Sequence, residues 1–223
     1  MAPAVFSGVQ REPAVFRQLI SSTAVVAVAT ALVMFSGTRV TAAEYAIDPA
    51  RTVVSFEVRN AGFSVQRGRL HGAIGTVGLD PKAGSGWIDI VVDARSIETG
   101  SKVMESFLRG KGLLNVEQYP EISYKAERVV FAYGEPQRIE GELTLLGVTR
   151  PVPLTVSEYA CTPRVLLVRQ RCMIDANATF KRSEFGMTRY TTFNSDEVKL
   201  AIRAEGVWPP TLDYQSARTQ RLP

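Results

Sequence analysis

The chain has 223 residues, of which 45% are hydrophobic and 22% are charged, with 26 Lys and Arg against 22 Asp and Glu. This length predicts one large domain or at most two. The apolar share is that of a globular protein, which excludes a disordered chain and a polytopic membrane protein. The single histidine, His71, argues against histidine-rich metal sites.

The first 43 residues differ in composition from the rest. Residues 18–38 carry no charge, lie between two arginines and are followed by Thr41-Ala42-Ala43. A basic segment, an apolar segment and a small-residue site are typical of a secretory signal peptide. We therefore expect residues 1–43 to be a signal peptide, and the mature protein to be periplasmic or secreted. The alternative is an uncleaved anchor, because about 20 apolar residues can span a bilayer.

Removal of this segment brings the charge close to neutral. Residues 1–43 contain three arginines and one glutamate, so residues 44–223 keep 23 basic and 21 acidic side chains, a net charge of +2. No run of five or more basic residues is present. The sequence therefore predicts no binding to nucleic acid.

From residue 45 onward, hydrophobic residues recur with a period of two, which is typical of β-strands. The segment over residues 63–79 contains four glycines, and its apolar residues change from one face of the strand to the other. This pattern predicts a bulge or a sharp bend. Eight strands joined by short polar turns favour an all-β fold, either an antiparallel barrel or a sandwich. The strand segments are residues 52–59, 63–79, 87–94, 122–133, 139–145, 152–156, 174–180 and 198–208.

One short helix is predicted between strands 3 and 4 of this series. Ser101 is a suitable N-cap, and Phe107 and Leu108 share the apolar face. Such a helix could plug one end of a barrel. Residues 209–223 are polar and begin with two prolines, which predicts a disordered tail. The folded domain is therefore expected over residues 44–208.

Cys161 and Cys172 are the two cysteines of the chain. In an exported protein an even number suggests a disulfide, which would contribute about 3 kcal/mol for a loop of this length. Two buried free thiols are the alternative. No histidine lies near them in sequence and their spacing is not CxxC, so neither a metal site nor a redox pair is predicted.

The sequence offers no catalytic constellation. GxGxxG, P-loop and HExxH motifs are absent, and a Ser-His-Asp or Cys-His arrangement would have to use His71, which lies in a strand pattern. We therefore expect a binding protein and not an enzyme. An eight-stranded barrel encloses a space just wide enough for side chains or for one slender ligand. Its inner face here alternates large apolar residues with Ala and Gly, so the interior is either a channel for a long apolar molecule or is filled by side chains.

Five stretches stand in order along the domain: residues 45–58 (YAIDP followed by VSFEV), 97–100 (IETG), 108–122 (leading to NVEQYPEI), 146–152 (LGVTRPV) and 180–187 (FKRSEFGM). This series resembles the YceI-like family of exported lipid- and polyisoprenoid-binding proteins over residues 45–208. The resemblance implies an eight-stranded antiparallel, lipocalin-like barrel around an apolar channel. It implies a long-chain apolar lipid as the partner, with no cofactor beyond a bound isoprenoid or quinone.

The residues predicted to contact such a ligand are Phe56, Phe63, Phe107, Leu108, Ile122, Tyr124, Phe185, Met187 and Arg182. Phe185 and Met187 would cover the opening of the barrel, with ordinary core packing as the alternative. Arg109, Lys111 and Arg182 are candidates for the polar head of the ligand, because cations pair well with phosphate oxygens. A homodimer and transient membrane contact are both left open by the sequence.

Two positions depart from the family pattern. Asn60 stands where many relatives have the histidine of V-x-H-x-G, and Phe107 stands where many have a histidine just before the leucine. Metal or haem contacts that need those imidazoles are therefore not expected. The resemblance favours a carrier or sequestering protein. The alternatives are an accessory protein of a membrane quinone or cytochrome redox system, and an enzyme acting on an isoprenoid lipid.

Overall fold

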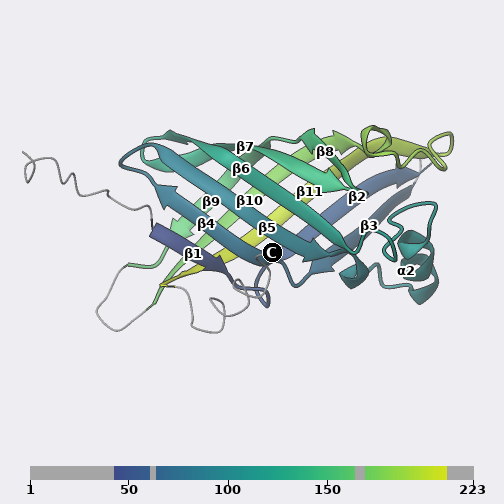
Figure 1. The fold of residues 1–223 in the computed structure, drawn as a ribbon, viewed down its shortest axis with the longest axis horizontal. Coiled ribbons are helices and arrows are strands. Elements are labelled where there is room, and N and C mark those ends of the chain that lie inside the picture. The colour runs from purple at the N-terminus through teal and green to yellow at the C-terminus, as the bar shows by residue number, and fades with distance from the viewer. Residues whose placement is uncertain (1–42, 61–63, 164–168, 210–223) are drawn as a thin grey trace, which may run out of the picture. The chain divides into compact units, whose positions relative to one another are not determined.

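The computed structural model describes residues 43–60, 64–163 and 169–209, in which eleven strands form one antiparallel sheet (Figure 1). The predicted signal peptide, except Ala43, and the predicted tail, except Pro209, lie outside the described residues. The strands are β1 (Ala43–Ile47), β2 (Val53–Asn60), β3 (Ser64–His71), β4 (Ile74–Asp80), β5 (Ser85–Asp93), β6 (Glu121–Ala132), β7 (Glu135–Leu145), β8 (Val148–Pro151), β9 (Leu154–Cys161), β10 (Gln170–Lys181) and β11 (Asn194–Trp208).

The sheet closes into a barrel with eight strand positions around it. The hydrogen-bonded order is β1-β4-β5-β6-β7-β9-β10-β11, and β11 pairs back onto β1 through Ala46↔Val207 and Ile47↔Gly206. The other three strands extend this circuit, since β2 continues β1 along β11, β3 continues β4 along β2, and β8 precedes β9 along β7. The prediction of an eight-stranded antiparallel barrel is therefore confirmed.

The position of the helix differs from the prediction. Helix α2 (Lys102–Arg109) follows β5 and a 3-10 turn, η1 (Ala94–Ser96), so it lies after the fifth strand and not between the third and fourth. The strands that flank it, β5 and β6, are the predicted segments 87–94 and 122–133. One strand that was not predicted, β1, and one break in a predicted segment raise the number of strands ahead of it. Residues 48–52 separate β1 from β2, and Gly72 and Ala73 divide the second predicted segment into β3 and β4. Gly72 has a φ of +71°, which glycine adopts without a steric penalty.

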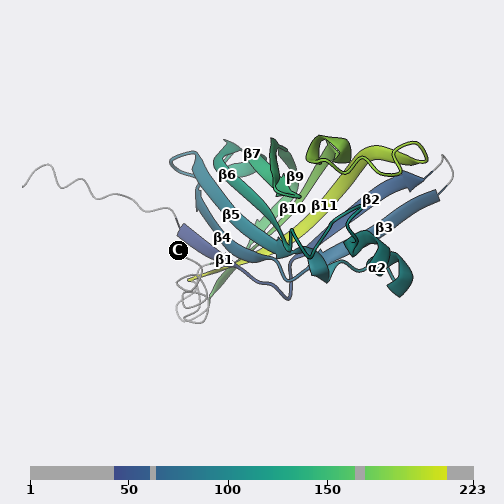
Figure 2. The same cartoon turned by 45° about the vertical axis from the view of Figure 1, so that its right-hand side comes forward.

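Hydrogen bonds to the residues at its two ends fix the bounds of helix α2. The Ser101 side chain accepts a hydrogen bond from the Met104 amide, as an N-cap does. At the other end, the Gly110 amide donates to the Phe107 carbonyl. The chain enters this segment from the end of β5 and returns at the start of β6, whose terminal residues Asp93 and Glu121 are paired. Helix α2 therefore lies at one end of the barrel, beside β3 in both Figures 1 and 2.

The two ends of the barrel are built from different turns. The end with α2, called here the α2 end, also carries the β2–β3 and β7–β8 connections and the segment that joins β10 to β11. The opposite end carries the β4–β5 and β6–β7 turns and the start of β10. It is called the disulfide end, because Cys161 and Cys172 pair there.

Side chains along the strands alternate between the interior and solvent. In β7, Ile139 and Leu143 are buried, whereas Glu140 and Glu142 are exposed. This period of two places the apolar face of each strand inside the barrel. No helix within the described ranges is both long and apolar enough to cross a bilayer.

Candidate functional site

The interior of the barrel holds a cavity of about 470 Å³. This is within the roughly 300–1,000 Å³ range of small-molecule sites. Its walls come from α2 and from strands on every side of the barrel, and they are predominantly aliphatic and aromatic. Buried residues such as Ile88, Leu154 and Ala176 belong both to the core and to the cavity wall. Of the two alternatives for the interior, the structure therefore favours a channel over complete filling by side chains.

Seven of the nine predicted contact residues line this cavity. Phe63 lies outside the described residues. Phe185 is fully buried but does not line the cavity, because its ring packs edge-on against Phe180 with centroids 5.2 Å apart. Of the two alternatives for Phe185, the structure therefore favours ordinary core packing. Contact of the other seven with a ligand stays a prediction; they are Phe56, Phe107, Leu108, Ile122, Tyr124, Arg182 and Met187.

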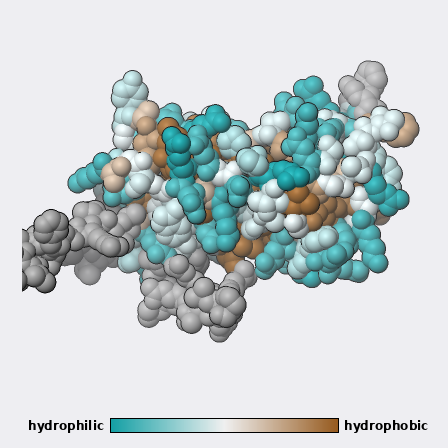
Figure 3. All heavy atoms as spheres, turned by 45° about the horizontal axis from the view of Figure 1, so that its top comes forward, coloured by the Kyte–Doolittle hydropathy of each residue, from teal (hydrophilic) through white to brown (hydrophobic). Residues whose placement is uncertain are grey.

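The α2 end of the cavity reaches the surface. Phe107 on α2 and Tyr190 on the β10–β11 connection both line the cavity, yet they are 48% and 43% exposed. Their rings meet with centroids 5.4 Å apart, so the two segments touch across the opening. Figure 3 shows brown, hydrophobic atoms among teal ones in both halves of this face, including the right-hand half that carries α2 and the β2–β3 hairpin in Figure 1. This opening is called the mouth.

Arg182 is a buried cation in the wall near the mouth. It begins a 3-10 turn, η2 (Arg182–Phe185), and its residue surface is only 4% exposed. The Nε atom donates to the Ser195 carbonyl at 3.1 Å, and Nη1 donates to the Arg189 carbonyl at 2.8 Å. The buried Nη2 has no hydrogen-bond partner among the described residues. A buried donor without a partner is costly, so this atom is suited to donate a hydrogen bond to an oxygen of a ligand.

The environment of Arg182 is held in place by its neighbours. Burial lowers the pKa of the Arg182 guanidinium, and the nearby Asp196 carboxylate opposes that shift. The Ser183 hydroxyl and amide donate to Asp196 at 2.6 and 2.9 Å, which fastens η2 to β11. Gly186 ends η2 with a φ of +84°, a value that favours glycine. The other two cations proposed for a polar head, Arg109 and Lys111, do not line the cavity.

Tyr124 contributes a polar group to the cavity wall, but this group already has a partner. Its hydroxyl donates to the Val152 carbonyl at 2.9 Å, and burial raises the pKa of the phenol. The tyrosine therefore presents its ring to the cavity and its oxygen to the backbone.

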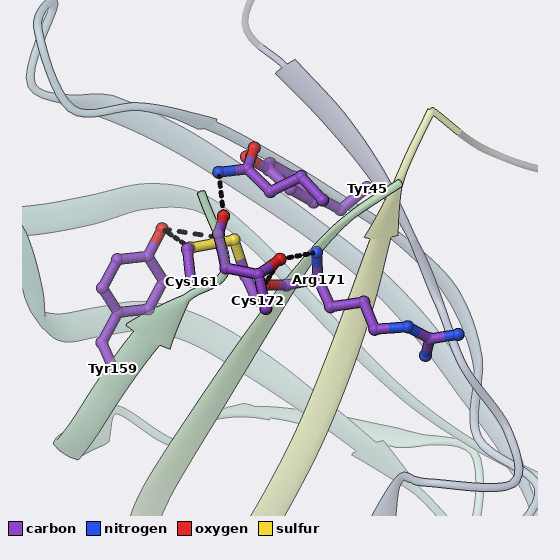
Figure 4. Close-up of a disulfide and its surroundings, with 7 residues drawn as sticks. Tyr45, Tyr159, Cys161, Arg171 and Cys172 are labelled. Carbon is purple, nitrogen blue, oxygen red and sulfur yellow. Dashed lines mark hydrogen bonds between the residues drawn. A yellow bond between two sulfur atoms is a disulfide. The ribbon is translucent and has the colours of Figure 1, made fainter. Parts of the chain in front are cut away.

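The disulfide end of the cavity is lined by groups that already have partners. Cys161 and Cys172 face each other on β9 and β10 and form a disulfide (Figure 4). The Tyr159 hydroxyl lies 3.0 Å from the Cys161 sulfur, and burial raises the pKa of this phenol. On the other side, the Tyr45 hydroxyl donates to the Gln170 side chain at 3.0 Å. Both tyrosine rings line the cavity.

Several lining residues were not predicted from the sequence. Tyr45 and Tyr159 lie on strands, where the alternating pattern was the available signal. Met104 is one turn before Leu108 on α2, so helical spacing could have found it. Tyr190 lies in an irregular connection, and no periodic pattern indicates that it faces the cavity.

His71 does not take part in the cavity. Its Nε2 atom lies 2.9 Å from a Glu98 carboxylate oxygen, and the residue is absent from the cavity wall. The two positions where the family pattern has histidine, Asn60 and Phe107, do line the cavity. Within the described part of the chain, no group of three or more His, Cys, Asp and Glu side chains could hold a metal ion.

Known proteins are similar to this chain in sequence and in fold. The family described as a YceI-like domain matches residues 45–206. A UPF0312 protein of Yersinia pestis (strain Pestoides F) is 29% identical over 177 residues, which are 78% of this chain and 91% of the relative.

Solved structures resemble the same region. BcnA of Burkholderia cenocepacia is similar with a TM-score of 0.58 and 23% identity, covering 71% of this chain and 98% of that one. A polyisoprenoid binding domain from Saccharophagus degradans is similar with a TM-score of 0.54 and 17% identity, covering 73% and 97%. At these identities the likeness shows a shared fold. Because the family match spans well over half of the residues, the chain belongs to the YceI-like domain family.

Proposed function

We propose that this protein is an exported carrier or sequestering protein that holds a long apolar lipid of the isoprenoid type. The observation that carries the proposal is the apolar cavity of about 470 Å³ along the barrel. Each methylene group moved from water into such a cavity contributes about 0.8 kcal/mol. The name of the S. degradans relative, a polyisoprenoid binding domain, supports the same ligand class.

In this proposal, the polar head of the ligand binds to Arg182. The unpaired Nη2 donor of this residue can bind a phosphate, carboxylate or carbonyl oxygen, and the guanidinium charge strengthens such a bond. The disulfide end has no comparable free donor among its described lining tyrosines, since Tyr45 and Tyr159 are both engaged. The lipid therefore lies with its head near the mouth and its tail toward the disulfide.

Export is supported by two features of the sequence. The first 43 residues resemble a signal peptide, and Cys161 and Cys172 form a disulfide, a bond that persists in oxidising compartments. Mass determination of the protein isolated from the periplasm tests this point. A mature chain that begins at Glu44 is expected, whereas an intact N-terminus on a membrane-bound protein would contradict it.

The identity of the ligand is tested on protein expressed from the full-length gene and purified from an exporting host. Native mass spectrometry measures the mass of the complex, and extraction with organic solvent then releases the ligand for analysis. We expect a co-purified lipid with an isoprenoid chain, and its mass would distinguish a phosphate from a quinone head. Protein that stays empty after exposure to geranylgeraniol and geranylgeranyl phosphate would contradict the proposal.

The role of Arg182 is tested by comparing those two probes. Arg182→Met should reduce the preference for geranylgeranyl phosphate over geranylgeraniol by roughly tenfold or more, since a charged hydrogen bond contributes about 1.5–3 kcal/mol. Lys111→Met is the matched control, because Lys111 is exposed and does not line the cavity. An unchanged preference in a folded Arg182→Met variant would show that the polar head of the ligand does not bind at Arg182.

A further inference from the structure

Exposed hydrophobic side chains gather at one end of the barrel. Six large hydrophobic residues are exposed within the described ranges, and five of them lie at the α2 end. Val103 on α2 is 82% exposed and Phe193 on the β10–β11 connection is 70% exposed. Neither lines the cavity, so neither is needed to hold a ligand. Exposed hydrophobic residues grouped in this way mark contact surfaces.

The same segments carry an excess of positive charge. Residues 102–112 and 186–193 contain four cations and one carboxylate, Glu105. That carboxylate is buried and accepts a hydrogen bond from Lys102 Nζ at 2.9 Å. Lys111 and Arg189 are exposed and have no described ion-pair partner. Apolar side chains flanked by cations suit a lipid surface that carries negative charge.

We infer that this mouth surface, formed by residues 102–112 and 186–193, docks onto an anionic lipid bilayer. The inference rests on the proposed function, because a carrier must exchange its lipid with a membrane. A lipid tail that crosses water is disfavoured by about fourfold for each exposed methylene. Since the mouth opens within this surface, docking gives the tail a path from bilayer to cavity that avoids water.

Sedimentation of the purified mature protein with vesicles tests the inference. Vesicles of phosphatidylcholine with phosphatidylglycerol are compared with vesicles of phosphatidylcholine alone. The protein should bind the anionic vesicles more tightly. Lys111→Gln combined with Arg189→Gln should weaken that binding by roughly fivefold for each cation removed. Val103→Ser combined with Phe193→Ser should weaken binding to both kinds of vesicle by about tenfold.

Matched controls lie at the opposite end. Tyr133, in the β6–β7 turn, is the exposed large hydrophobic residue of the disulfide end, and Lys82 is an exposed cation in the β4–β5 turn. Tyr133→Ser and Lys82→Gln should bind vesicles as the unmodified protein does. Equal losses from the control and mouth variants would overturn the inference, as would a protein that binds neither kind of vesicle. Retained vesicle binding by both mouth variants would also overturn it and would point to a protein partner.

A second measurement separates this inference from the proposed function. The Val103→Ser/Phe193→Ser variant should bind geranylgeraniol from detergent solution with unchanged affinity, because neither residue lines the cavity. If the unmodified protein binds vesicles but never geranylgeraniol or its phosphate, docking stands and the carrier function fails. If it binds these lipids but no vesicle, the carrier function stands and docking fails.

Discussion

Ala176→Phe is expected to block the cavity without harming the fold. Ala176 is a buried residue of β10 that lines the cavity. Phenylalanine adds roughly six carbon atoms, and if they displace as many methylenes of a ligand, the lost burial is about 5 kcal/mol. That loss corresponds to more than a thousandfold in affinity. In a filled core, the same substitution would cost about 1–3 kcal/mol of stability through overpacking.

Two measurements together decide this prediction. Titration with geranylgeraniol should show the loss of affinity, and thermal denaturation should show an unchanged or higher Tm, because the new ring fills empty space. Ala201→Phe is the matched control, since Ala201 lies on the exposed face of the neighbouring strand. A Tm lowered by about 2–4 °C for each kcal/mol of overpacking, with affinity unchanged, would show that the interior is packed and that the ligand lies elsewhere.

Three further predictions concern stability and pH. Tyr124→Phe should lower the free energy of unfolding by about 1 kcal/mol, because its hydroxyl loses a buried hydrogen bond to the backbone; urea denaturation measures this, and no change would contradict it. Replacing both Cys161 and Cys172 with serine should cost about 3 kcal/mol, seen as a lower Tm only under oxidising conditions. The hydrogen bonds from Arg203 lower the pKa of Asp175, so this carboxylate stabilises the fold above its ordinary pKa and the contribution is lost as the pH falls through the folded pKa. Asp175→Asn should therefore lower the Tm at neutral pH but not in strong acid, and a difference independent of pH would refute this.

The barrel could be predicted because its strands are amphipathic. Ile139 and Leu143 alternate with glutamates along β7, and this spacing is typical of a strand with one buried face. The positions at which strands begin and end were harder to predict. The glycine-containing segment correctly suggested a bend, but the pattern could not show that Gly72 divides it into β3 and β4, which shifted the helix to a later place in the strand order. Strand β1 is only five residues long and follows the apolar N-terminal segment directly, so alternation gave it little signal.

Only part of the site could be predicted for a similar reason. Ile122 and Tyr124 lie on the inner face of β6, and alternation indicated them. Arg182 was predicted as a contact residue, but its burial was not, because arginine on an irregular segment is usually exposed and this burial depends on the packing of η2 against β11. Tyr190 likewise reaches the cavity through a connection whose path depends on tertiary contacts. Sequence patterns place residues on faces of regular elements, whereas turns that cover a barrel end follow no period.

In the proposed function, the different chemistry of the two ends sets the direction in which a lipid enters. At the disulfide end, the Tyr45 and Tyr159 hydroxyls have partners, so a polar head carried there would have to be dehydrated with little to replace the lost water. At the α2 end, Arg182 offers an unused donor beside an opening flanked by exposed rings. An amphiphile that enters tail first leaves its head at this donor and never drags a charged group through the apolar channel. In the proposed function, the same end therefore serves as both the opening and the head site, so that one face of the barrel meets the membrane and loads the lipid.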